Sequence, residues 1–143
     1  MNVASILSVK GRDVFTIQPH LTIGEACKLL ADKGVGALVV CGADGSVRGI
    51  FSERDLVRAI CEEGAQALQS PVSRHMTHRV VTTHPEASVQ HLMEEMTQGR
   101  FRHIPIVEDG RLTGIVSIGD VVKWHVEEIE NEHQAMRDYI AHT

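Results

Sequence analysis

One short phrase occurs twice in this chain of 143 residues, and its duplication constrains the fold more than any other feature. The first copy runs from Gly49 to Asp55 and the second from Gly114 to Asp120. Each copy is a glycine, a short apolar strand end, and then Ser-x-x-Asp at the start of a helical pattern. A strand that leads into a helix leaves free backbone N–H groups at the helix start, and these favour an anionic ligand. The duplication therefore predicts two related ligand sites.

The sequence around the two phrases also repeats. Each copy has a short helical lead-in, a strand ended by proline, a capped helix, a buried strand, a turn, a returning strand and a second helix. The copies align with one extra residue near Gly42, so equivalent pairs include Thr16 with Thr82 and Asp55 with Asp120. This is an internal duplication of a β-α-β-β-α unit. The predicted fold class is α/β (α+β), with two repeats related by pseudo-two-fold symmetry and a C-terminal helix.

The spacing of apolar residues predicts the individual elements. Strands are expected at residues 14–17, 37–41, 47–51, 80–83, 104–107 and 112–116, and helices after the N-caps Thr22, Ser52, Ser88 and Ser117. The predicted division is residues 1–66 for the first repeat, 67–126 for the second and 127–143 for the C-terminal helix. Apolar residues spaced as in a coiled coil predict that the tail packs on the body or on a second subunit: Val122, Val126, Ile129, His133, Met136 and Ile140.

Composition excludes several classes of function. The net charge of -5 and the pI near 6.0 argue against nucleic acid as a partner, because phosphate backbones select basic surfaces. The three cysteines are an odd number at wide spacing, which predicts reduced thiols and a cytoplasmic location. Neither a signal peptide nor a membrane-spanning stretch is expected.

The motifs also resemble a known family. Residues 101–105 read Phe-Arg-His-Ile-Pro, residues 109–120 read Asp-Gly-x-x-x-Gly-Ile-Val-Ser-x-x-Asp, and weaker counterparts run from Val35 to Asp55. With these motifs, the duplicated unit resembles a tandem pair of cystathionine-β-synthase (CBS) domains, a Bateman module. It is similar in particular to the small stand-alone CBS-pair proteins of bacteria and plant organelles. The resemblance covers about residues 1 to 126.

What the resemblance implies is a regulatory module, not an enzyme, that binds adenosine-containing ligands between its repeats. AMP is the first expectation, with ADP, ATP, NAD(H) and S-adenosylmethionine as alternatives, and the implied role is that of an energy or redox sensor. Paired modules of this family usually associate through their helices. The implied partners are therefore a second copy of the chain, as a homodimer, and an unidentified regulated protein, without nucleic acid, membrane or metal.

The resemblance also implies roles for individual residues. Asp55 and Asp120 would accept hydrogen bonds from ribose hydroxyls, and Ser52 and Ser117 would contact phosphate. The other implied nucleotide-binding residues line the clefts, bring positive charge to phosphate, or, for the isoleucine, cover the base: Thr16, Gly36, Ala37, Arg54, Arg58, Thr82, Thr83, Arg102, His103 and Ile104. The first repeat lacks the Arg-His pair and the proline of the second, so the two sites are predicted to differ in the nucleotide that they hold.

Simpler interpretations of the same residues stay open. Ser-x-x-Asp is also a plain helix N-capping box, and Arg102 and His103 also suit ordinary surface positions before a strand. The nine histidines are scattered singly, so a metal site is not expected, although His75 and His78 are three residues apart. The main alternative function is a non-catalytic interaction scaffold with vestigial clefts, which binds a protein partner through its acidic C-terminal helix.

Overall fold

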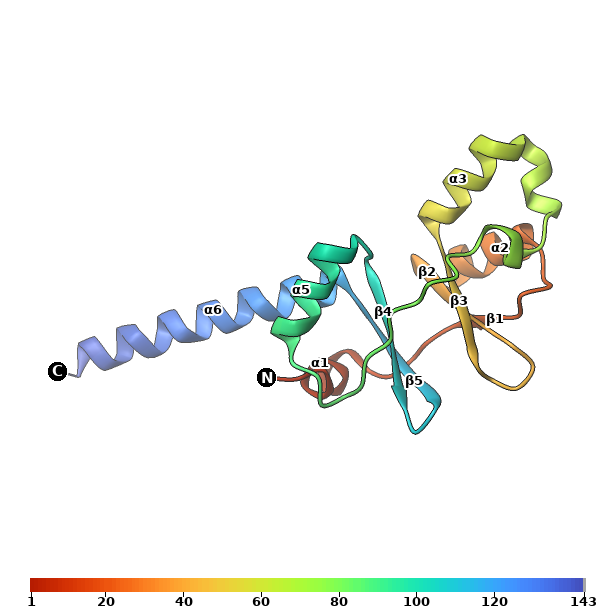
Figure 1. The fold of residues 1–143 in the computed structure, drawn as a ribbon. Helices are drawn as coiled ribbons and strands as arrows, with labels where there is room; N and C mark the ends of the chain where they lie inside the picture. Colours follow the sequence, from red (N-terminus) through yellow and green to blue (C-terminus); the bar gives the residue numbers. More distant parts are fainter. Residues whose placement is uncertain (143) are drawn as a thin grey trace.

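Two α/β halves lie side by side, and a long helix projects from one of them (Figure 1). This computed structural model describes residues 1–142; Thr143, the end of the predicted C-terminal helix, lies outside the described residues. The first repeat contains α1 (Val3–Lys10), β1 (Thr16–Ile17), α2 (Ile23–Lys33), β2 (Ala37–Cys41), β3 (Val47–Ser52) and α3 (Glu53–Glu63). The short helix η1 (Gly64–Gln69) follows, and then come α4 (Val72–His75), α5 (Val89–Gly99), β4 (His103–Glu108), β5 (Arg111–Ser117) and α6 (Ile118–Ala141). The mixed fold class is confirmed, and the element order repeats except that the second repeat has no strand between α4 and α5.

The long helices start at the predicted caps. At Ser52 and Ser117 the serine hydroxyl accepts from the backbone N–H three residues later, and the aspartate there accepts from the backbone N–H of the serine. Thr22 forms the same reciprocal box, and Ser88 accepts from the backbone N–H of His91. These bonds satisfy N–H groups that have no partner within the helix. Ser-x-x-Asp therefore has a structural role in both repeats.

The two sheets are not equal. In the first half, β1 pairs with β2 in parallel and β2 pairs with β3 in antiparallel fashion; in the second half, β4 and β5 form an antiparallel pair. The strand predicted at residues 80–83 is wrong, because only an isolated bridge at Thr83 joins this segment to β4. In the first half, the N–H of Val39 donates to the carbonyl of Phe15 at 3.1 Å. The aligned position in the second half is Pro105, which has no N–H, so this bond of the ladder cannot form.

Each half completes its hydrophobic core with the lead-in helix of the other repeat. Val3, Ile6 and Leu7 of α1 are buried in a cluster with residues of α5, β4 and β5. Conversely, Val72 in α4 and Met76 just after it lie in the cluster of the first half. The chain thus crosses between the halves twice, and each crossing buries apolar side chains. This exchange holds the two sheets next to each other.

The predicted tail helix continues the last helix of the second repeat, so that α6 is one helix of 24 residues. Its first turns pack on the body through Val121, which is buried, and Trp124, whose ring N–H lies 3.1 Å from the sulfur of Met1. Beyond them the apolar stripe is open to solvent, with Val126 47% and Met136 60% exposed. Within residues 1–142, the body therefore does not cover the stripe (Figure 1).

The exchange of lead-in helices gives a direct test. Leu7→Ala removes a side chain that is 2% exposed, and we expect it to lower the free energy of unfolding by about 2–5 kcal/mol. Val9→Ala on the same helix is the control; Val9 is 75% exposed, and we expect a change of at most about 0.5 kcal/mol. Hydrogen exchange on Leu7→Ala should show lost protection in β4 and β5. Loss confined to β2 and β3 would contradict the exchanged core.

Candidate functional site

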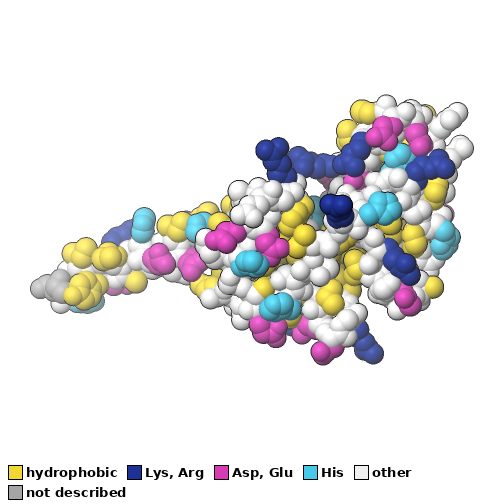
Figure 2. Space-filling model, in the orientation of Figure 1, with side chains coloured by type: hydrophobic (Ala, Val, Ile, Leu, Met, Phe, Trp, Pro, Cys, Tyr) yellow, Lys and Arg dark blue, Asp and Glu magenta, His cyan; other side chains and the backbone are white. Residues whose placement is uncertain are grey.

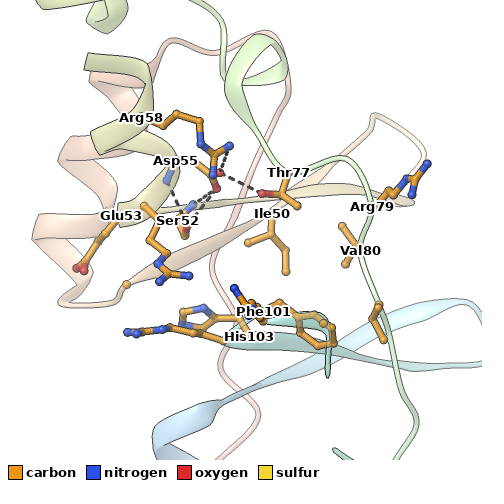
Figure 3. A pocket seen from close by; sticks show the side chains of 16 residues that line it. Ile50, Ser52, Glu53, Asp55, Arg58, Thr77, Arg79, Val80, Phe101 and His103 are labelled. Atoms are coloured by element: carbon orange, nitrogen blue, oxygen red, sulfur yellow. Dashed lines mark hydrogen bonds and ion pairs between the residues drawn. The ribbon is translucent and has the colours of Figure 1, made fainter. Parts of the chain in front are cut away.

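A cavity of about 330 Å³ opens between the two halves, and we call it the first cleft. Its volume lies within the range of about 300–1,000 Å³ of small-molecule sites. Figure 3 shows Ser52, Asp55 and Arg58 entering from one side, and Phe101 and His103 from the opposite half. The other lining residues come from β3, α3, the segment before α5 and the loops before β2 and β4: Gly36, Ile50, Glu53, Arg54, Thr77, Arg79, Val80, Val81, Gly99, Arg100 and Arg102.

A smaller cavity of about 210 Å³, the second cleft, is its symmetry mate. In the alignment of the repeats, Ser117 corresponds to Ser52 of the first cleft, and Asp13 corresponds to Arg79. The second cleft is lined by Lys10, Asp13, Val14, Phe15, Val35, Gly36, Ala37, His103, Ile115 and Ser117. Gly36 and His103 line both clefts, so the two cavities meet at the junction of the halves.

Asp55 is the buried polar centre of the first cleft, with a side chain only 2% exposed. Its Oδ2 accepts from the backbone N–H of Ser52 at 2.8 Å and from its hydroxyl at 3.1 Å. Its Oδ1 accepts from the hydroxyl of Thr77 at 3.0 Å and lies 3.5 Å from Nη1 of Arg58. Three of the roughly four acceptor positions of the carboxylate are thus filled by hydrogen bonds, and a ribose hydroxyl would take the fourth, which faces Arg58. Arg58 can give way to it, because its contact is long and its side chain is 58% exposed.

Asp120, the equivalent residue of the second repeat, has a cationic partner from far along the chain. Its Oδ2 accepts from the N–H and hydroxyl of Ser117, and Lys10 Nζ forms a salt bridge to the same oxygen. Lys10 also donates to the carbonyl of Ile115 at 2.7 Å. Burial raises the pKa of Asp120, but the hydrogen bond and charge of Lys10 and the bonds from Ser117 outweigh it and hold this pKa below its ordinary value. The ammonium group of Lys10, which lines the second cleft, is thus already paired with the carboxylate of Asp120.

His103 stands between the clefts as a neutral side chain at neutral pH. Burial lowers its pKa, and the nearby charges of Lys10 and Arg102 lower it further, against the opposing effect of Asp120 and Glu53. A neutral imidazole donates one hydrogen bond and accepts another. His103 therefore offers polar contacts to a ligand rather than the positive charge that the resemblance implied for it.

The structure gathers about half of the implied nucleotide-binding residues at the first cleft: Gly36, Ser52, Arg54, Asp55, Arg58, Arg102 and His103. Ala37 and Ser117 line the second cleft. Thr16 lines a separate hollow between the tips of the two hairpins, and Asp120, Thr82, Thr83 and Ile104 line none of these three cavities. Ile104 is fully buried in the core of the second half, where its side chain packs with other apolar residues.

The sequence analysis did not single out several residues that line the clefts. Arg79, Arg100 and Thr77 line the first cleft, and Lys10 lines the second. Arg79 and Arg100 could have been found from the alignment, because they stand opposite Asp13 and Gly34 of the first repeat. Lys10 gave no such signal, since its partner Asp120 is 110 residues away.

Residues 1–142 contain neither a metal-binding cluster nor a membrane-spanning helix. No group of three or more His, Cys, Asp or Glu side chains is arranged to hold a metal ion. In the same part of the chain, no helix is long and apolar enough to cross a membrane.

Comparison with known families decides the relationship. The family model for the CBS domain matches residues 6–62 and again residues 72–127. The chain belongs to the CBS-domain family. The two matches confirm a tandem CBS pair, whereas the predicted division at residues 66 and 126 stays a prediction.

Relatives of this CBS pair occur in plants and bacteria. It is 39% identical over 123 residues to the mitochondrial CBS domain-containing protein CBSX3 of Arabidopsis thaliana, covering 83% of this chain and 60% of the plant protein. It is 32% identical over 130 residues to the CBS domain-containing protein YhcV of Bacillus subtilis, covering 91% of this chain and 89% of that protein. The chain thus spans less than two thirds of the length of the plant relative.

Solved CBS structures share the fold. A CBS-domain protein from Agrobacterium tumefaciens matches with a TM-score of 0.85 and 52% identity, over 87% of this chain and 99% of the other. A CBS-domain protein from Pyrobaculum aerophilum, solved in complex with AMP, matches with a TM-score of 0.75 and 26% identity, over 84% and 89%. A further CBS pair, in complex with 5′-methylthioadenosine and S-adenosyl-L-methionine, matches with a TM-score of 0.78 and 25% identity, over 87% and 99%.

The salt bridge in the second cleft predicts a pH dependence. Because the pKa of Asp120 is lower in the folded than in the unfolded state, Asp120 stabilises the fold above its unfolded pKa of about 3.9. This contribution is lost as the pH falls through the folded pKa. We therefore expect wild type to be more stable than Asp120→Asn at about pH 6, and the difference to shrink progressively as the pH falls below about 3.9.

Chemical denaturation of both proteins across this range measures the effect. Lys10→Met is the matched variant, since it removes the ammonium group and leaves the capping box; it should weaken the same pH dependence. A stability difference between wild type and Asp120→Asn that is constant with pH would show that Asp120 acts as a neutral cap only.

Proposed function

We propose that the chain is a regulatory module that binds an adenine nucleotide in the first cleft and acts as an energy or redox sensor without catalysis of its own. The observation that carries the proposal is the buried Asp55, bonded to the partly buried Ser52, which faces Arg102 and His103 of the other half across a cavity of ligand size. The complexes of two structural neighbours with AMP and with 5′-methylthioadenosine and S-adenosyl-L-methionine support an adenosyl ligand.

The first cleft offers a different surface to each part of a nucleotide. Ile50, Val80 and Phe101 provide an apolar side for the base (Figure 3). The 2′-hydroxyl of the ribose bonds to Asp55 in place of Arg58, because Ser52 and Thr77 fill the other acceptor positions of the carboxylate. The released guanidinium of Arg58 then turns to the phosphate, which it can hold with two hydrogen bonds. Binding thus exchanges one partner of Asp55 for another and leaves no buried charge unpaired.

Occupancy of this cleft can be passed on to α6. The carbonyl of Arg102, at the cleft, accepts from the N–H of Ile118, the first residue of α6, at 2.8 Å. A ligand that bonds to α3 and to the segment of Arg102 also connects the two halves. We propose that it changes their relative angle or the order of α6, and so alters a contact with a second copy of the chain or with a regulated protein.

The alternative is an interaction scaffold with vestigial clefts, and one observation favours it. Val126, Ile129 and Met136 form an exposed apolar stripe on the part of α6 that projects from the body. A scaffold needs no ligand, so this alternative expects that no adenine nucleotide binds to the folded protein.

The nucleotide site can be tested by removing the ribose contact from the protein, with Asp55→Asn, or from the ligand, with a deoxyribose. We expect Asp55→Asn to weaken AMP binding about 10- to 100-fold, because it removes a hydrogen bond to a charged acceptor. Deoxyadenosine monophosphate, which lacks the 2′-hydroxyl, should bind wild type about tenfold more weakly than AMP, and the two ligands should bind Asp55→Asn alike. Calorimetry on protein freed of bound nucleotide measures all four affinities.

Asp120→Asn is the matched control, since it makes the same change in the other capping box. We expect it to leave AMP affinity within about twofold of wild type, because Asp120 already has Lys10 as its partner. Equal losses in both variants would point to a general effect on the fold. Absence of binding by wild type would favour the scaffold.

Coupling to α6 has a separate readout. We expect saturating nucleotide to change the rate of hydrogen exchange by about tenfold or more in the first turns of α6, because the first residue of α6 donates to the carbonyl of Arg102. Sedimentation velocity should show wild type as a dimer and Val126→Glu/Ile129→Glu as a monomer, because the charges interrupt the apolar stripe. Glu127→Gln/Glu130→Gln is the control with changes off the stripe. Unchanged exchange and unchanged sedimentation would contradict a role of α6 in the response.

A further inference from the structure

The first cleft is far more cationic than its symmetry mate. Five arginines line it, against the two carboxylates of Glu53 and Asp55: Arg54, Arg58, Arg79, Arg100 and Arg102. The aligned residues of the other repeat are Gly119, Lys123, Asp13, Gly34 and Gly36, of which Asp13 and Gly36 line the second cleft. The fold is shared by both repeats and so cannot account for this difference.

Most of this charge is available to a ligand. Arg58 lies near Asp55, but no carboxylate of residues 1–142 forms a salt bridge with Arg54, Arg79, Arg100 or Arg102. Figure 2 shows Lys and Arg side chains gathered along the hollow between the two halves. Like charges at close range repel one another, so an unpaired cluster of this kind is stabilised when an anion binds.

Arg100 stands where an arginine is conformationally unfavourable. It caps the end of α5 with a φ of 55°, in the left-handed region that favours glycine. The aligned residue of the first repeat, Gly34, ends α2 in the same conformation with a φ of 64°. The second repeat therefore accepts a less favourable residue at this cap and gains a guanidinium at the cleft.

From this asymmetry we infer that the first cleft selects an adenosine polyphosphate over AMP and over uncharged adenosyl compounds. The inference rests on the proposed function and deepens it. A single phosphate is satisfied by Arg58 and Arg102, whereas a di- or triphosphate reaches the unpaired arginines at the rim and bonds to several of them at once. The second cleft does not share this selectivity, since Asp13 lines it and its one lysine is held by Asp120.

A ligand series on the full chain tests the inference. We expect affinity to rise from AMP to ADP to ATP by at least about threefold per phosphate, and the preference to shrink at high salt. Arg79→Gln and Arg100→Gly should each weaken ATP binding about three- to tenfold and affect AMP less, whereas Arg102→Gln should weaken the binding of both ligands. Arg100→Gly should also raise the melting temperature, because it relieves the left-handed conformation.

Arg48→Gln is the control, since Arg48 is exposed and lines neither cleft. An equal loss of ATP affinity in Arg48→Gln and Arg102→Gln would overturn the inference, because net charge would then explain it. Inorganic triphosphate that binds as tightly as ATP would also overturn the inference, because it would indicate a surface for any polyanion.

The failure of this inference can be told apart from the failure of the proposed function. If AMP binds as tightly as ATP and Asp55→Asn abolishes the binding of both, the polyphosphate inference is wrong and the nucleotide site stands. If no nucleotide binds, both are wrong.

Discussion

Burial of each lead-in helix in the core of the opposite repeat is the interaction on which the rest of the structure depends. Leu7 shows how close the fit is, since a Cβ on Gly114 would lie 3.1 Å from its side chain. Neither half has a complete core on its own, so both must form together. This joint packing places the start of α3 opposite the loop before β4, and the clefts are the spaces left between these surfaces.

Ser-x-x-Asp has two roles that use the same atoms. In each repeat it is a reciprocal capping box, which accounts for the serine and the aspartate without any ligand. The roles differ in what else the carboxylate contacts. Asp55 contacts Thr77 and the exposed Arg58 at a cavity, whereas Asp120 contacts Lys10. A motif of this kind therefore marks a place where a ligand can bind, and the residues around it decide whether that place is open.

Local chemistry made much of the fold predictable, because caps, turns and apolar periodicity act over a few residues. The four helix starts, five of the six strands and the duplication follow from such patterns. The missing ladder before Thr83 depends on Pro105 lacking an N–H, which a strand pattern does not register. The pairing of Lys10 with Asp120 joins residues at opposite ends of the sequence, so only the folded chain reveals it. The same holds for the exchange of lead-in helices.

Duplication explains why the two clefts can differ so much. The backbone of both repeats is fixed by shared caps and cores, so a change at a position that lines only one cleft alters that cleft and leaves the other intact. At Gly36 and Arg102 the difference is a guanidinium group; at Gly34 and Arg100 it is a guanidinium on a backbone conformation that suits glycine better. A structural role would favour glycine at both caps. The arginine at position 100 is therefore explained by the positive charge that it brings to the first cleft. A phosphate-rich ligand can bind to this charge, whereas the fold itself does not need it.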